Sequence, residues 1–160
     1  MGRHGLAMET EKTLIKLLSK VAVKRFMDKL TAELSKLDFD INHLSISKIA
    51  GKQDNALSKT LSEGEDPRLS SFLRYWYAIS TISKKETGQE TPILFEKLFD
   101  PEVKRILKMI SDLGNPNPLF NEYKDTFKGW KVYVDLLAKQ NAITQEEITA
   151  YNDFLSKLEK

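Results

Sequence analysis

Apolar residues recur three or four positions apart along nearly the whole chain, and this spacing places them on one face of an α-helix. The strict alternation of apolar and polar residues that is typical of strands is absent. Glycine and proline cluster between the apolar stretches, where they favour turns. The pattern therefore predicts an all-α protein.

The first apolar stretch follows Thr10, a candidate N-cap, and ends at Leu37. Its spacing fits one long helix, or two helices with a break near Ser19 and Lys20. We expect the segment 11–20 to pack either between subunits or against helices of the C-terminal half.

Two short helices are predicted next. Asn42 is a good N-cap for the first, and Gly51 follows it, where a residue in the left-handed conformation would end a helix. The second is expected from about residue 54 to residue 62. Leu57 and Leu61 lie four positions apart in it, so they share one face and anchor this helix in the core.

Three pairs of a capping residue and a proline predict further helix starts, since proline is favoured at the first helical position. These pairs are Asp66-Pro67, Thr91-Pro92 and Asp100-Pro101. The helix after the first pair has an apolar and aromatic set that we expect in the core: Leu69, Phe72, Leu73, Tyr75, Trp76, Tyr77, Ile79 and Ile82.

The segment 83–90 contains no apolar side chain and is the best linker candidate in the chain. It separates an N-terminal helical domain (10–82) from a C-terminal domain of three or four helices (91–160). In the latter, the break at 114–118 precedes an aromatic helix over 119–139. Thr144 and Glu147 have the spacing of a capping box for the last helix.

Charge and composition narrow the class of protein. Residues 1–85 carry 15 basic and 10 acidic side chains, whereas residues 86–160 carry 10 and 13. A basic front half and an acidic back half fit a nucleic-acid module joined to a protein-contact module. The chain has no cysteine, no apolar run long enough to span a membrane and no secretion signal. We therefore expect a cytoplasmic protein.

The most informative residues lie between 46 and 69. Ile46-Ser47-Lys48-Ile49-Ala50-Gly51 is followed by Leu57-Ser58-Lys59-Thr60-Leu61, then by Gly64, Asp66-Pro67 and Leu69. Residues 22–82 resemble the helix-turn-helix domain of phage-repressor proteins of the Cro/C1 or Xre type, while the C-terminal half matches no family that we recognise. The resemblance implies an N-terminal domain of four to five helices that binds double-stranded DNA, in a homodimeric regulator from a phage, a plasmid or a bacterial chromosome.

In such domains the second of the two short helices enters the major groove. The resemblance therefore implies base contacts from Gln53, Asn55, Ser58 and Lys59. It implies contacts to DNA phosphates from Asn42, His43, Lys48, Lys52, Arg68 and Arg74. Phosphate contacts position the protein, whereas base contacts give specificity.

The sequence contains no motif that indicates an enzyme. His4 and His43 are the only histidines and have no metal-binding spacing with carboxylates. A nucleophile-elbow pattern and a phosphate-binding glycine loop are also absent. We expect a sequence-specific transcriptional regulator without catalytic residues, metal or cofactor.

Two alternatives remain open. Segment 40–80 carries five basic and five acidic residues, which is unfavourable for phosphate binding. The same scaffold would then serve as a protein-binding module, an inhibitor or antagonist of another protein, with no role on DNA. In the other alternative, residues 91–160 hold a small-molecule effector, so that this half serves dimerisation, partner contact or effector sensing.

Overall fold

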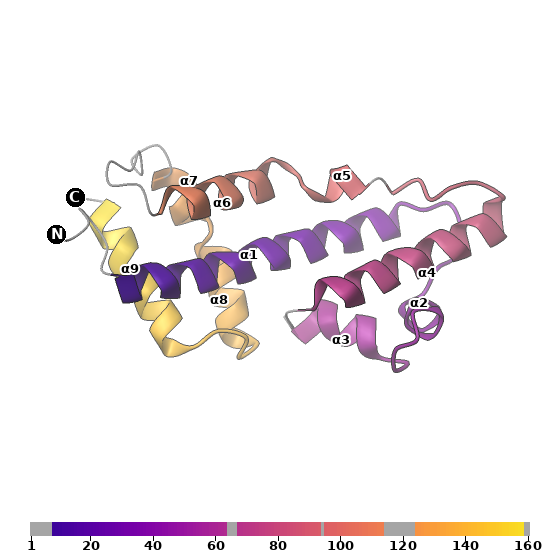
Figure 1. Cartoon of the computed structure of the whole chain (residues 1–160), viewed down its shortest axis with the longest axis horizontal. Helices are drawn as coiled ribbons and strands as arrows, with labels where there is room; N and C mark the ends of the chain where they lie inside the picture. Colours follow the sequence, from indigo (N-terminus) through magenta and orange to yellow (C-terminus); the bar gives the residue numbers. More distant parts are fainter. Residues whose placement is uncertain (1–7, 64–66, 94, 114–123, 159–160) are drawn as a thin grey trace. The chain divides into compact units, whose positions relative to one another are not determined.

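The computed structural model describes residues 8–63, 67–93, 95–113 and 124–158, and the regular secondary structure in these ranges is entirely α-helical (Figure 1). The predicted all-α class is therefore confirmed. Within the same ranges, no helix has both the length and the apolar character that crossing a membrane requires.

The first apolar stretch forms one uninterrupted helix, α1 (Met8–Ser35). The alternative of two helices with a break near Ser19 is therefore wrong, and Thr10 lies inside the helix instead of capping it. No proline or glycine interrupts this stretch, so nothing local ends the helix before Ser35.

The chain divides into two compact units that interleave in sequence. Unit 1 comprises Met1–Arg25 and Phe99–Lys160, and unit 2 comprises Phe26–Leu98. This division differs from the predicted domains, because α1 contributes its first part to unit 1 and its second part to unit 2.

The predicted linker at 83–90 is helical over most of its length. Helix α4 (Leu69–Thr87) continues through it, Ser83 is fully buried, and Gly88 ends the helix with a φ of 71°. Lysine and glutamate are good helix formers, so this polar segment continues the helix instead of forming a linker.

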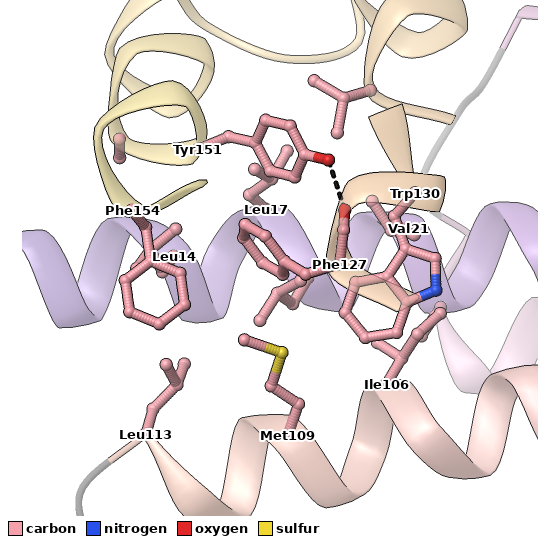
Figure 2. Close-up of a cluster of buried hydrophobic side chains, with 14 of the residues drawn as sticks. Leu14, Leu17, Val21, Ile106, Met109, Leu113, Phe127, Trp130, Tyr151 and Phe154 are labelled. Atoms are coloured by element: carbon pink, nitrogen blue, oxygen red, sulfur yellow. Dashed lines mark hydrogen bonds between the residues drawn. The ribbon is translucent and has the colours of Figure 1, made fainter. Parts of the chain in front are cut away.

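Unit 1 packs the first part of α1 against the C-terminal helices, which agrees with the second alternative for the segment 11–20. These helices are α6 (Pro101–Asp112), α7 (Lys124–Gly129), α8 (Lys131–Lys139) and α9 (Gln145–Leu158). Figure 2 shows their shared core, in which Phe127 lies among aromatic rings. Its ring centroid is 4.6 Å from that of Tyr151, 5.1 Å from Phe154 and 5.7 Å from Trp130.

The single aromatic helix predicted over 119–139 is divided, and its residues 119–123 lie outside the described ranges. Trp130 separates α7 from α8. Its amide N–H bonds to the carbonyls of both Thr126 and Phe127, at 3.1 Å and 3.2 Å, and its own carbonyl accepts from Tyr133 at 2.9 Å. The bonds that join Trp130 to Phe127 and Tyr133 span three positions each, so they tighten the chain at Trp130, whose side chain is buried in the core.

Two of the predicted helix starts in unit 1 are confirmed in atomic detail. Asp100 caps α6, because its Oδ1 accepts from the amide of Val103 at 3.0 Å. Thr144 and Glu147 form the capping box of α9, in which each side chain accepts from the other residue's amide at 3.2 Å.

Both caps are also tied to α1 by ion pairs. Arg25 Nη2 donates to Asp100 Oδ2 at 2.6 Å, and Lys20 Nζ donates to Glu147 Oε1 at 2.9 Å. Burial by itself lowers the pKa of Arg25, but the hydrogen bond to Asp100 and the nearby Tyr133 outweigh this effect and raise it. The local caps thus also fix the position of α1 within unit 1.

The buried hydroxyl of Tyr151 donates to the carbonyl of Phe127. Burial raises the pKa of Tyr151, and the charge of Asp135 adds to this effect, so the hydroxyl stays a neutral donor. Tyr151→Phe leaves a buried carbonyl without its donor and is expected to lower the free energy of unfolding by about 1–2 kcal/mol.

Chemical denaturation of both proteins measures this loss. Tyr77→Phe is the matched control, because Tyr77 is 63% exposed and its substitution should change stability by less than about 0.5 kcal/mol. Equal losses in the two variants would contradict the role given to the Tyr151 hydroxyl.

Unit 2 contains the second part of α1, then α2 (His43–Ile49), α3 (Ala56–Glu63), α4 and α5 (Phe95–Leu98). Helix α2 contacts both α3 and α4, and Phe26 of α1 meets Phe72 of α4 edge-on with ring centroids 4.7 Å apart. The buried apolar side chains of this unit are Met27, Leu30, Leu34, Ile46, Ala50, Leu57, Phe72, Tyr75, Ala78, Ile79, Ile82, Ile93 and Leu98.

The other two cap-and-proline pairs do not start helices as predicted. Helix α4 begins at Leu69 with Arg68 at the N-cap, so Pro67 precedes the cap, and Asp66 lies outside the described ranges. Thr91 accepts from the amide of Ile93 at 3.3 Å, which closes a turn ahead of α5. A threonine or aspartate before proline serves turns as readily as helices.

Candidate nucleic-acid interface

The connection from α2 to α3 begins with a tight, fully hydrogen-bonded helix end. Gly51 has a φ of 73°, and its amide donates to the carbonyl of Lys48 at 3.0 Å. The amide of Lys52 donates to the carbonyl of Ser47 at 2.9 Å. This pair of bonds is the Schellman motif, which needs a left-handed residue at the position of Gly51. The predicted role of Gly51 as a helix terminator is therefore confirmed.

Gly51→Ala is expected to lower the free energy of unfolding by about 1 kcal/mol, because an L-residue is strained in the left-handed region. A Cβ at this position meets no atom within 4 Å, so the loss reports the backbone conformation and not a clash. Thermal or chemical unfolding measures it.

Gly129→Ala provides the control with the opposite expected sign. Gly129 lies in α7, and a Cβ there also meets open space. Alanine in a helix is favoured over glycine by up to about 1 kcal/mol. If both substitutions change stability alike, the strain argument for Gly51 fails.

Ser47 joins α2 to α3 by a hydrogen bond that the sequence did not reveal. It is fully buried, and its Oγ accepts from the amide of Leu57 at 3.1 Å. The first amides of a helix lack intrahelical acceptors, so this bond caps α3 from the neighbouring helix. The sequence indicated only that Ser47 is small enough for two helices to cross closely.

Helix α3 has a clear inward face and a clear outward face. Leu57 is fully buried and Thr60 is 6% exposed, while Leu61, predicted to face inward, is only partly buried. Asn55 and Lys59 are four positions apart and exposed on the opposite side. The amide of Lys59 bonds to the carbonyl of Asn55 at 2.9 Å, so the helix begins directly after Asn55.

Two of the residues predicted to contact DNA bind each other. His43 Nδ1 and Ser58 Oγ are 2.9 Å apart, which links the first residue of α2 to α3. Both residues line a cleft of about 550 Å³, together with residues of α1 that include Asp28 and Ser35. Ser58 therefore contributes to this cleft, while Asn55 and Lys59 face away from the core.

Other predicted contacts are also held by bonds within unit 2. The side-chain oxygen of Asn42 caps α2, accepting from the amide of Ser45 at 2.8 Å. Lys52 Nζ donates to Ser71 Oγ at 2.7 Å. This bond brings Lys52 to the first turn of α4, where Arg68 occupies the N-cap.

The remaining residues predicted to contact DNA are exposed, and no hydrogen bond or ion pair within the described ranges brings them together. Gln53 lies in the turn between α2 and α3, Lys48 on α2 and Arg74 on α4. Asp54, also exposed, precedes Asn55 and brings a negative charge to this side of α3. The described ranges hold no cluster of three His, Asp or Glu side chains suited to a metal ion.

Comparison of the chain with protein-family models, with curated protein sequences and with solved structures gives no match.

Proposed function

We propose that α2, the Gly51 turn and α3 form a helix-turn-helix of the phage-repressor type, and that the chain is a sequence-specific DNA-binding regulator acting in the cytoplasm of a bacterial cell. In this proposal α3 enters the major groove, where amide and ammonium side chains bond to base edges. Asn55, directly before α3, and Lys59, on its exposed face, make the base contacts.

The observation that supports this proposal best is that α3 is held in place on its buried side, opposite the residues proposed to contact DNA. Leu57 is fully buried, and its amide is bound by the buried Ser47 of α2. A side chain reads bases well only when its helix is held rigidly by the scaffold. The outward Asn55 and Lys59 meet this requirement, and Gln53 adjoins them.

A phosphate contact is assigned to the start of α4. Lys52 and Arg68 place two positive charges there. Such contacts position a protein on DNA without reading its sequence. Lys48, Arg74 and His43 are assigned to phosphates as well, and the chain is assigned a homodimeric state on the DNA.

Asn55→Ala and Lys59→Ala test the base contacts. Each is expected to weaken binding to an operator in the protein's own promoter region by about 5- to 150-fold, since a good base contact contributes about 1–3 kcal/mol. Fluorescence anisotropy with a labelled duplex measures the affinity, and circular dichroism checks that the variants are folded.

Lys139→Ala is the control, because Lys139 is an exposed lysine at the end of α8 in the other unit. It should leave operator affinity unchanged. Binding by the wild type should also weaken steeply as salt rises. If Asn55→Ala and Lys59→Ala both bind as tightly as the control, the assignment of α3 is wrong.

The second candidate function is a protein-binding module on the same scaffold, an inhibitor or antagonist of another protein. This function is favoured because several side chains predicted to contact DNA form hydrogen bonds within unit 2 instead. They are those of Asn42, His43, Ser58 and Lys52. If this second function is the right one, the protein binds an operator duplex no more tightly than a random duplex. Any salt-dependent affinity for DNA is then the same in the wild type and in Lys59→Ala.

A further inference from the structure

Helix α4 carries an exposed apolar stripe that the sequence pattern assigned to the core. The stripe consists of Leu69, Leu73 and Tyr77, which are 70%, 51% and 63% exposed. They lie at positions i, i+4 and i+8, so they form one row along the helix. The core face of α4 is a different one, formed by Phe72, Tyr75, Ala78, Ile79 and Ile82. Single exposed apolar residues are ordinary on protein surfaces, whereas a row of large ones marks an interaction site.

The surface of α4 around this stripe is basic. Between positions 67 and 85 the sequence has no acidic residue and four basic ones, Arg68, Arg74, Lys84 and Lys85. Lys84 forms an exposed ion pair with Glu90 at 3.4 Å, so we assign the attraction of anions to the other three. Arg68 is at the N-cap, Arg74 is beside the middle of the stripe, and Lys85 is in the last turn, all exposed. Positive charge therefore accompanies the stripe along the helix.

We propose that this stripe docks the chain onto the surface of a bilayer that contains anionic phospholipids. The three apolar side chains enter the boundary between headgroups and acyl chains, while Arg68, Arg74 and Lys85 meet the headgroup phosphates. Helices with apolar and basic side chains lie in the plane of such an interface without crossing it. This docking is a separate property from the proposed DNA binding and does not depend on it.

The combination of apolar and basic side chains favours a lipid surface over other polyanions. DNA phosphates attract the arginines but offer no apolar region for Leu69 and Leu73. A protein partner needs a groove shaped to receive three protruding side chains, with acidic residues beside it. A bilayer provides both the anionic and the apolar region and adapts to protruding side chains of any shape. The ring of Tyr77 is amphipathic, and such rings prefer the headgroup level.

Vesicle flotation of the full chain without DNA tests the docking. The wild type is expected to float with vesicles of equimolar phosphatidylglycerol and phosphatidylcholine and to remain unbound with phosphatidylcholine alone. Arg74→Gln should lower the partition coefficient about fivefold, the effect of one positive charge near an anionic surface. The matched control is Lys139→Gln, because Lys139 is an exposed lysine of α8 in the other unit. It should partition like the wild type.

The apolar contribution is tested separately, since any basic surface adsorbs weakly to anionic lipid. Leu73→Glu should lower the partition coefficient more than about 10-fold, because it removes an inserted side chain and adds a negative charge. The matched control is Val132→Glu on α8, which changes the net charge equally at a residue that is 70% exposed. It should partition like the wild type, and circular dichroism checks that both variants are folded.

An environment-sensitive fluorophore shows which surface enters the bilayer. The chain has no cysteine of its own, so Leu73→Cys and Val132→Cys each provide a single labelling site for a nitrobenzoxadiazole dye. With the phosphatidylglycerol vesicles, emission of the dye at position 73 should shift to shorter wavelength, as it does when such a dye leaves water. The dye at position 132 should keep the emission it has in buffer.

Three results would overturn the proposal. The first is a wild type that does not float with the anionic vesicles, which is also the result expected if an acidic protein covers the stripe. The others are equal effects of Leu73→Glu and Val132→Glu, and equal emission shifts at the two labelled positions. The measurements contain no DNA, so they succeed or fail independently of the proposed operator binding.

Discussion

Phe127→Ala is expected to lower the free energy of unfolding by about 3–5 kcal/mol, the range found when a buried phenylalanine is truncated. Phe127 is fully buried and lies among the rings of Trp130, Tyr151 and Phe154 in unit 1. Its removal leaves a cavity that rigid aromatic neighbours close poorly. The lost free energy therefore has two parts. One is the stabilisation from removing the ring from water, and the other is the van der Waals contacts that neighbouring side chains make with the ring.

Chemical denaturation gives the total loss, and hydrogen exchange locates it. Amides of α6, α7, α8 and α9 should lose the most protection. Phe39→Ala is the matched control, because Phe39 is only partly buried and lies in the connection between α1 and α2. A Phe127→Ala variant no less stable than Phe39→Ala would contradict the account of the unit 1 core.

Leu57→Ala is the second substitution with a large expected effect, a loss of about 2–5 kcal/mol. Leu57 is fully buried, and its amide is the one that Ser47 binds. Truncation removes the main apolar anchor of α3, which has only eight residues. So short a helix is stabilised mainly by its packing and not by its own propensity.

The matched control is Leu44→Ala, the same substitution on α2 at a position that is 43% exposed. It should cost less than about 1 kcal/mol. In Leu57→Ala, hydrogen exchange should show the amides of α3 opening before those of α1. Uniform loss of protection throughout unit 2 would mean that Leu57 does not specifically anchor α3.

The sequence predicted best those features that depend on near neighbours. Asn42, Gly51, Asp100 and the Thr144–Glu147 pair act within one helical turn, and the structure has them in the predicted roles. Their hydrogen bonds join residues three to five positions apart, so the residue types and their spacing were sufficient.

Features that depend on distant residues were not predictable. The bond from Ser47 to Leu57 spans ten positions, and no spacing rule marks a serine as the cap of the next helix. The two units interleave because α1 continues past Arg25. A pattern of apolar residues indicates a helix but does not state which part of it packs against which partner.

The apolar stripe of α4 shows the same limit at single residues. Leu69, Leu73 and Tyr77 satisfy the helical period, yet the core contacts only the other face of the helix. Periodicity predicts which side chains share a face, whereas burial depends on what the rest of the chain places against that face.

The central proposal is that α3 reads a specific DNA sequence, and selection from a random duplex library with the purified full chain tests it most directly. Parallel selections with Lys59→Ala and Lys139→Ala supply the comparison. We expect the wild type and Lys139→Ala to enrich one common motif, and Lys59→Ala to lose the preference at one or more of its positions. Absence of any enriched motif with the wild type, or an identical motif with Lys59→Ala, would contradict it.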